Sequence, residues 1–64
     1  MNKKEVMNGI GYYHQSSEHD LEIWQNAKGD EIVIDLKGCT VLKICRFDYG
    51  WLTKEEIEAI DKIM

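Results

Sequence analysis

The stretch Trp51-Leu52-Thr53-Lys54-Glu55-Glu56-Ile57 carries a complete start signal for a C-terminal helix. Thr53 stands at the N-cap position, where its hydroxyl can accept a hydrogen bond from the backbone N–H of Glu56. The Glu56 side chain can in turn accept from the Thr53 N–H, which completes a capping box. Leu52 and Ile57 flank the box at the positions of a hydrophobic staple. The sequence therefore predicts a helix that begins directly after Thr53.

This predicted helix is amphipathic, with an apolar stripe on one side and charged residues on the other. The stripe consists of Ile57, Ile60, Ile63 and Met64. The charged side consists of Glu55, Glu58, Asp61 and Lys62. The acidic face is either solvated or an imitation of a nucleic-acid backbone. The apolar stripe needs a surface to pack on, which the preceding residues must supply.

Two turn motifs lie nine residues apart, Asn26-Ala27-Lys28-Gly29 and Asp35-Leu36-Lys37-Gly38. Asn or Asp favours the first position of a type I turn, and the glycine supplies the left-handed residue that follows. This combination is typical of a three-residue hairpin loop. The sequence therefore predicts an antiparallel meander with strands at about Leu21–Asn26, Asp30–Asp35 and Cys39–Asp48.

The region 17–28 also fits a helix, capped by Ser17 and ended by Gly29, with Leu21 and Trp24 on one side. The turn chemistry and the alternation of Leu21 with Ile23 favour the strand.

The N-terminal part gives weaker signals. A short helix over residues 2–8 has Asn2 as its cap and Gly9 as its end. The aromatic pair Tyr12-Tyr13 favours a strand at about 10–15. The polar run from Ser16 to Asp20 indicates a loop.

The expected loops determine a register in which Asp35 lies opposite Cys39 and Glu31 lies opposite Lys43. One sheet face then carries Trp24, Ile32, Ile34, Leu42 and Ile44. The other carries Leu21, Ile23, Val33, Cys39, Val41, Cys45 and Phe47. Both faces are apolar, and one helix covers only one of them. We therefore expect the N-terminal segment, a second subunit or a partner to cover the other.

Together these elements predict one α+β domain over residues 1–64. It is a three- to four-stranded antiparallel β-meander with a C-terminal α-helix packed on one face. No secretory signal and no apolar run of about 20 residues is present, so we expect a cytoplasmic protein away from membranes. The net charge of −4 and pI near 5.0 disfavour direct nucleic-acid binding, which relies on basic residues.

Metal binding and catalysis are not indicated. His14, His19, Cys39 and Cys45 are the candidate zinc ligands. The two cysteines would lie roughly 20 Å apart on a straight strand, too far to share an ion or to form a disulfide. Gly9-Ile10-Gly11 lacks the third glycine of a dinucleotide fingerprint. We expect a protein without catalytic residues, metal or cofactor, whose thiols are free and buried.

Two aromatic groups are candidates for recognition. Tyr, Trp and Arg dominate binding hot spots and can also hold nucleotides by stacking and phosphate contacts. The candidate binding residues are Arg46, Tyr49, Trp51, Tyr12, Tyr13 and His14. The competing interpretation is a core corner in which Phe47 and Trp51 are buried and Gly50 makes the turn.

The functional hypothesis is a small non-enzymatic binding protein. It would form a homo-oligomer, through the second apolar face or an edge strand, and would inhibit or modulate a partner protein. A phage or mobile-element counter-defence factor that acts on a host protein fits this size and charge. One alternative is an oligomeric binder that sequesters a nucleotide-like anion. The other is an accessory structural subunit.

Overall fold

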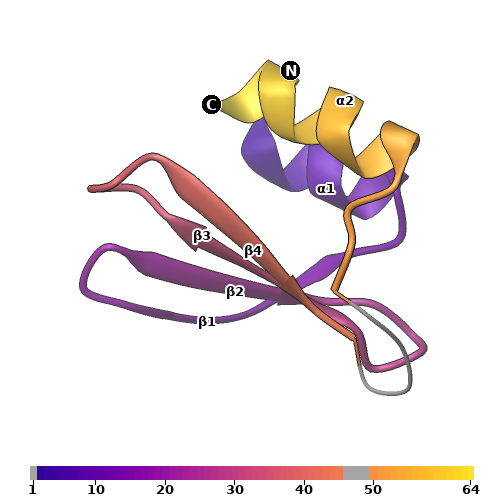
Figure 1. The fold of residues 1–64 in the computed structure, drawn as a ribbon, viewed down its shortest axis with the longest axis horizontal. Coiled ribbons are helices and arrows are strands. Elements are labelled where there is room, and N and C mark those ends of the chain that lie inside the picture. The colour runs from indigo at the N-terminus through magenta and orange to yellow at the C-terminus, as the bar shows by residue number, and fades with distance from the viewer. Residues whose placement is uncertain (1, 46–49) are drawn as a thin grey trace.

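The computed structural model describes residues 2–45 and 50–64, which form one antiparallel sheet with two helices on the same face (Figure 1). The elements are α1 (Lys3–Gly9), β1 (Tyr13–Glu18), β2 (Leu21–Gln25), β3 (Glu31–Asp35), β4 (Thr40–Ile44) and α2 (Lys54–Ile63). The strands follow the order β1-β2-β3-β4, and each pairs antiparallel with the next. The predicted α+β meander with a C-terminal helix is confirmed.

The capping box at the start of α2 is also confirmed. The Glu56 N–H donates to the Thr53 hydroxyl at 3.2 Å, and the Thr53 N–H donates to Glu56 Oε1 at 2.9 Å. These bonds satisfy donors that a helix start otherwise leaves open.

The buried side of α2 differs from the predicted stripe. Its buried residues are Glu56, Ala59 and Ile60, and Ile63 packs against the core. Ile57 is 46% exposed, and Met64 is also exposed. The helix is turned so that its capping carboxylate faces inward, which moves Ile57 towards solvent.

The N-terminal helix α1 forms because Asn2 caps it, with its side chain accepting from the Glu5 N–H at 2.8 Å. It ends in a Schellman motif: Tyr12 N–H donates to the Met7 carbonyl, and Gly11 N–H donates to that of Asn8. Gly11 holds the left-handed position of this motif, with φ of 87°. The motif brings Tyr12 and Met7 together in the core.

The hairpin of β1 and β2 is longer than predicted. β1 starts at Tyr13 because the preceding residues close α1, and it continues to Glu18, so the predicted loop from Ser16 to Asp20 is wrong for residues 16–18. The connection shrinks to His19 and Asp20, since Glu18 lies opposite Leu21.

The β2–β3 hairpin follows the prediction. Gly29 has φ of 91°, and the Asn26 side chain accepts the N–H groups of Lys28 and Asp30. Trp24 lies opposite Ile32. The helix alternative for 17–28 is therefore wrong.

The β3–β4 loop has four residues instead of three. Asp35 lies opposite Thr40 instead of Cys39. Its Oδ1 accepts the N–H groups of Lys37 and Gly38. The left-handed residue is Cys39, with φ of 54°, and not the predicted Gly38.

This extra residue exchanges the two faces of β4, because side chains alternate along a strand. Val41 and Lys43 now lie on the helix side, while Leu42 and Ile44 lie on the far side. The predicted pair of Glu31 with Lys43 is wrong, and Lys43 lies opposite Ile32.

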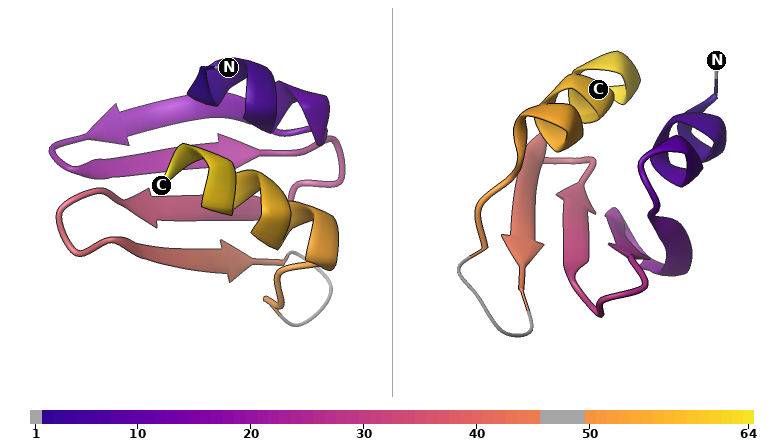
Figure 2. Two further views of the ribbon diagram at one scale, coloured as in Figure 1. Left: turned by 90° about the horizontal axis from the view of Figure 1, so that it is seen from above. Right: turned by 90° about the vertical axis from the view of Figure 1, so that its right-hand side faces the viewer.

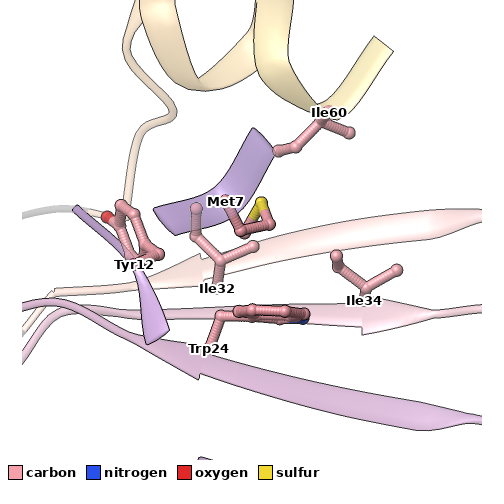
Figure 3. Close-up of a cluster of buried hydrophobic side chains, with 6 residues drawn as sticks. All are labelled: Met7, Tyr12, Trp24, Ile32, Ile34 and Ile60. Atoms are coloured by element: carbon pink, nitrogen blue, oxygen red, sulfur yellow. The ribbon is translucent and has the colours of Figure 1, made fainter. Parts of the chain in front are cut away.

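The core lies between the sheet and the two helices (Figure 3). It consists of Met7, Tyr12, Trp24, Ile32, Ile34 and Ile60, with Ile10, Val41, Leu52 and Ile63 packed around them. Figure 2 shows both helices over the same side of the sheet. The N-terminal segment therefore does not cover the second apolar face.

The β3–β4 loop generates a test of the register. Cys39→Gly should raise the free energy of unfolding by about 1 kcal/mol, because glycine adopts the left-handed conformation without the cost of a side chain. Urea denaturation measures this change.

Gly29→Ala is the matched control, and it should lower stability by a similar amount. If Cys39→Gly instead lowers stability, as glycine does inside a strand, the three-residue loop is correct and the four-residue loop is wrong.

Candidate functional site

A buried ion pair joins β4 to α2. Lys43 Nζ lies 2.8 Å from Glu56 Oε1 and 3.0 Å from Oε2. Both side chains are almost completely buried. The Tyr12 hydroxyl donates to Glu56 Oε2 at 2.7 Å, and the Thr53 N–H donates to Oε1. One carboxylate thus receives bonds from β4, from the residue before β1 and from its own helix cap.

The charges of this cluster stabilise one another. Burial raises the pKa of Glu56, but the bonds from Lys43, the Thr53 backbone and Tyr12 outweigh it and hold that pKa below its usual value. Burial lowers the pKa of Lys43, but Glu56 outweighs it and the pKa is raised. Burial and then the bond to Glu56 raise the pKa of Tyr12 well above its usual value.

The cluster is suited to holding the fold together. Among the described residues, no buried side-chain nitrogen or oxygen lacks a hydrogen-bond partner. A catalytic carboxylate needs a free position for a substrate proton, whereas both oxygens of Glu56 are already engaged. Sequence reasoning assigned Glu56 to the cap alone and placed Lys43 on the other face. The signal it missed is a lysine between apolar strand residues, which needs a buried acid when it faces inward.

The first aromatic group is divided between the core and the surface. Tyr12 is 1% exposed and packs in the core. Tyr13 is 56% exposed on β1. His14 is exposed as well, and its ring meets the edge of Trp24 at 5.2 Å between centroids. Of the three predicted binding residues, Tyr13 and His14 therefore present side-chain surface to solvent.

Of the second aromatic group the structure describes Trp51, which follows Gly50 near the opposite edge of the sheet. Trp51 is 77% exposed, so the predicted corner with a buried Trp51 is wrong. Gly50 lies so close to the Lys43 carbonyl that a Cβ could not be added, which places this segment beside β4. Trp51 is thus not brought together with Tyr13 and His14, which lie on β1 at the other edge of the sheet. Arg46, Phe47 and Tyr49 lie outside the described residues.

The sheet face opposite the helices, here called the open face, carries a contiguous apolar surface. Its central strip is Leu42, Val33 and Ile23, which lie opposite one another across β4, β3 and β2. Ile44 and Leu21 extend the strip on either side. Leu42 is 59% exposed and Ile44 is 47% exposed. The helices cover the other side of the same strands (Figure 1).

The rim of the open face is acidic. Glu18 lies opposite Leu21, Glu31 opposite Ile44, and Asp35 opposite Thr40. Within the described strands the one lysine or arginine is Lys43, and it faces the helices.

Both edges of the sheet resist strand addition. β1 has an irregular register between His14 and Ser16, and its residues are exposed and mostly polar. β4 carries the inward-facing charge of Lys43, and Gly50 lies against the Lys43 carbonyl. Bulges and inward charges are the usual protection of an edge strand. Both edge strands therefore carry features that protect a sheet against strand addition.

A groove of about 340 Å³ lies between the two helices. It is lined by Glu5, Val6, Gly9, Ile10, Glu55, Glu58, Ala59 and Lys62. This lining contains no serine, cysteine or histidine, and its carboxylates would repel an anion.

No group of side chains suited to holding a metal ion is found in the described part of the chain. There, no three His, Cys, Asp or Glu side chains come together as ligands. Cys39 and Cys45 are both free, but Cys39 is exposed and not buried as expected. Neither described helix is long and apolar enough to cross a membrane.

The buried pair predicts a strongly non-additive mutant cycle. Lys43→Met and Glu56→Gln should each lower the free energy of unfolding by about 3 kcal/mol, because each leaves a partner without its counterpart. The double variant should lose clearly less than the sum of the two. Urea denaturation of all four proteins measures the coupling, and simple additivity would contradict the pair.

The same pair predicts an acid-sensitive stability. The pKa of Glu56 is lowered on folding, so its contribution is present above the ordinary glutamate pKa of about 4.3 and is lost as pH falls further. Between pH 5 and pH 3 the Lys43→Met/Glu56→Gln protein should lose less free energy of unfolding than the wild-type protein, because it has no Glu56 carboxylate to protonate. Urea midpoints across this range test it, and equal slopes would contradict it.

The chain was compared with protein families, with curated proteins and with solved structures. No family model, curated protein or solved structure matches this chain.

Proposed function

We propose that this chain is a non-enzymatic protein-binding module whose docking surface is the open face. The observation that carries the proposal is the contiguous apolar strip of Leu42, Val33 and Ile23, flanked by Ile44 and Leu21. Single exposed apolar residues are common on proteins, but a contiguous apolar area with a polar rim is typical of an interaction site.

The Glu56 cluster and the groove between the helices are less suited to binding than the open face. The buried carboxylate of Glu56 is occupied by three donor groups. The groove between the helices holds carboxylates and one lysine, which suits neither nucleophilic catalysis nor a nucleotide-like anion. The apolar strip of the open face consists of hydrocarbon side chains, which can bind a surface but cannot react with it. The module would therefore inhibit or modulate its partner by covering part of that partner's surface.

Site-specific photo-crosslinking tests the proposal. A benzophenone amino acid is placed at position 44 on the open face or, in a second protein, at position 57 on α2. Ile44 and Ile57 are the same residue type and are 47% and 46% exposed, so reactivity and access are matched. Position 44 should give a discrete crosslinked product in the producing cells, and position 57 should give none.

The crosslinked product is identified by mass spectrometry. Products of equal yield from both positions, or from position 57 alone, would contradict docking through the open face. Ile44→Lys and Ile57→Lys proteins serve as stability controls. Both should change the free energy of unfolding by about 0.5 kcal/mol or less, since neither side chain lies in the core.

A further inference from the structure

We propose that the occupant of the open face is another protein's surface with an apolar centre flanked by lysine and arginine side chains. A second copy of this chain is not the preferred occupant. This inference rests on the proposed function, because it names the partner chemistry of the same face.

The first argument is charge complementarity. The strand register places Glu18, Glu31 and Asp35 along the open face, and Asp35 also accepts two N–H groups of the β3–β4 loop through Oδ1. The ion pairs among the described residues join Lys3 to Glu22 and Lys43 to Glu56, so these pairs do not include the rim. A basic partner would be attracted by this rim and would be steered onto it at low salt.

The same rim disfavours face-to-face pairing of two copies. Such a pair would bring two acidic rims together around the apolar strip, because the nearest exposed lysines, Lys28 and Lys37, lie in the hairpin loops beyond the strand ends. Like charges brought together across an interface weaken it and disfavour that partner. The strand lysine that could have offset this, Lys43, is buried on the other side with Glu56.

The second argument is area. The backbone extends 27 × 23 × 18 Å. Figure 1, which looks down the shortest axis, shows the sheet from its edge. The flat footprint of the backbone on this face is on the order of 500 Å², and the accessible surface of its side chains is larger, so the whole face is comparable with the roughly 800 Å² that each partner buries in a standard interface. An interface of standard size therefore takes in the acidic rim as well as the apolar strip.

The third argument is the shape of the apolar part. Leu42, Val33 and Ile23 form one row across three strands, which spans about 10 Å at the usual strand spacing. Two or three apolar side chains on a partner fill such a row. The carboxylates of the rim then surround the partner's apolar side chains. Lysine or arginine residues next to those side chains can form ion pairs with the rim.

Two synthetic amphipathic peptides test the chemistry. They share the same leucine positions, and one has lysine and the other glutamate at every polar position. Each is titrated into the full chain while the amide NMR signals are followed. The lysine peptide should shift the signals of Ile23, Val33 and Leu42, should bind more weakly as salt rises, and should bind at least about fivefold more tightly than the glutamate peptide.

Matched charge variants separate the rim from general attraction to an acidic protein. Glu18→Gln/Glu31→Gln removes two charges from the open face, and Glu55→Gln/Glu58→Gln removes two from α2. The first should weaken the lysine peptide about fivefold, and the second should change its affinity little. Equal effects of the two variants would overturn the proposal.

The remaining outcomes also decide the matter. If both peptides shift the open face with equal affinity, the basic rim of the partner is wrong but docking through this face stands. If neither peptide shifts the open face, the proposed partner chemistry is wrong, and crosslinking at position 44 decides separately whether the face docks at all. The chain is also diluted on its own. If its open-face signals shift, and the self-association Kd from that dilution is below the Kd of the lysine peptide, the occupant is a second copy.

Discussion

The ion pair between Lys43 and Glu56 is the interaction on which the arrangement of this small fold depends. Its carboxylate is at once the cap of α2, the counterion of β4 and the acceptor for the Tyr12 hydroxyl. A buried carboxylate without a cation is costly. The strand that faces Glu56 must therefore present its lysine inward, and that requirement selects one of the two possible registers for β4.

This constraint explains which parts of the fold could be predicted from the sequence. The capping box at Thr53 and the turn at Asn26 are local, since the residues that make the bonds are within four positions of one another. The register of β4 is not local. The turn motif Asp35-Leu36-Lys37-Gly38 predicts a register in which Leu42 and Ile44 share the face of Ile32, and the residue that reverses this choice, Glu56, lies 13 residues beyond Lys43.

The candidate site shows the same division. The inference that the sheet has a second apolar face, which the C-terminal helix does not cover, survives because Leu21, Ile23 and Val33 lie on the open face under either register of β4. The places of individual aromatic residues depend on tertiary contacts that the sequence does not display. Tyr12 enters the core because a Schellman motif turns the chain after α1, and Trp51 points to solvent. Aromatic residues fit cores and interfaces equally well, so composition does not distinguish the two.

The positions of the two helices have a practical consequence for handling the molecule. α1 begins at Lys3 and α2 ends at Ile63, so both ends of the described chain lead out on the helix side of the sheet (Figures 1 and 2). A tag, a fluorophore or a surface attachment joined at either end is therefore held away from the open face. The chain can be immobilised through either end with its apolar strip turned towards the solution.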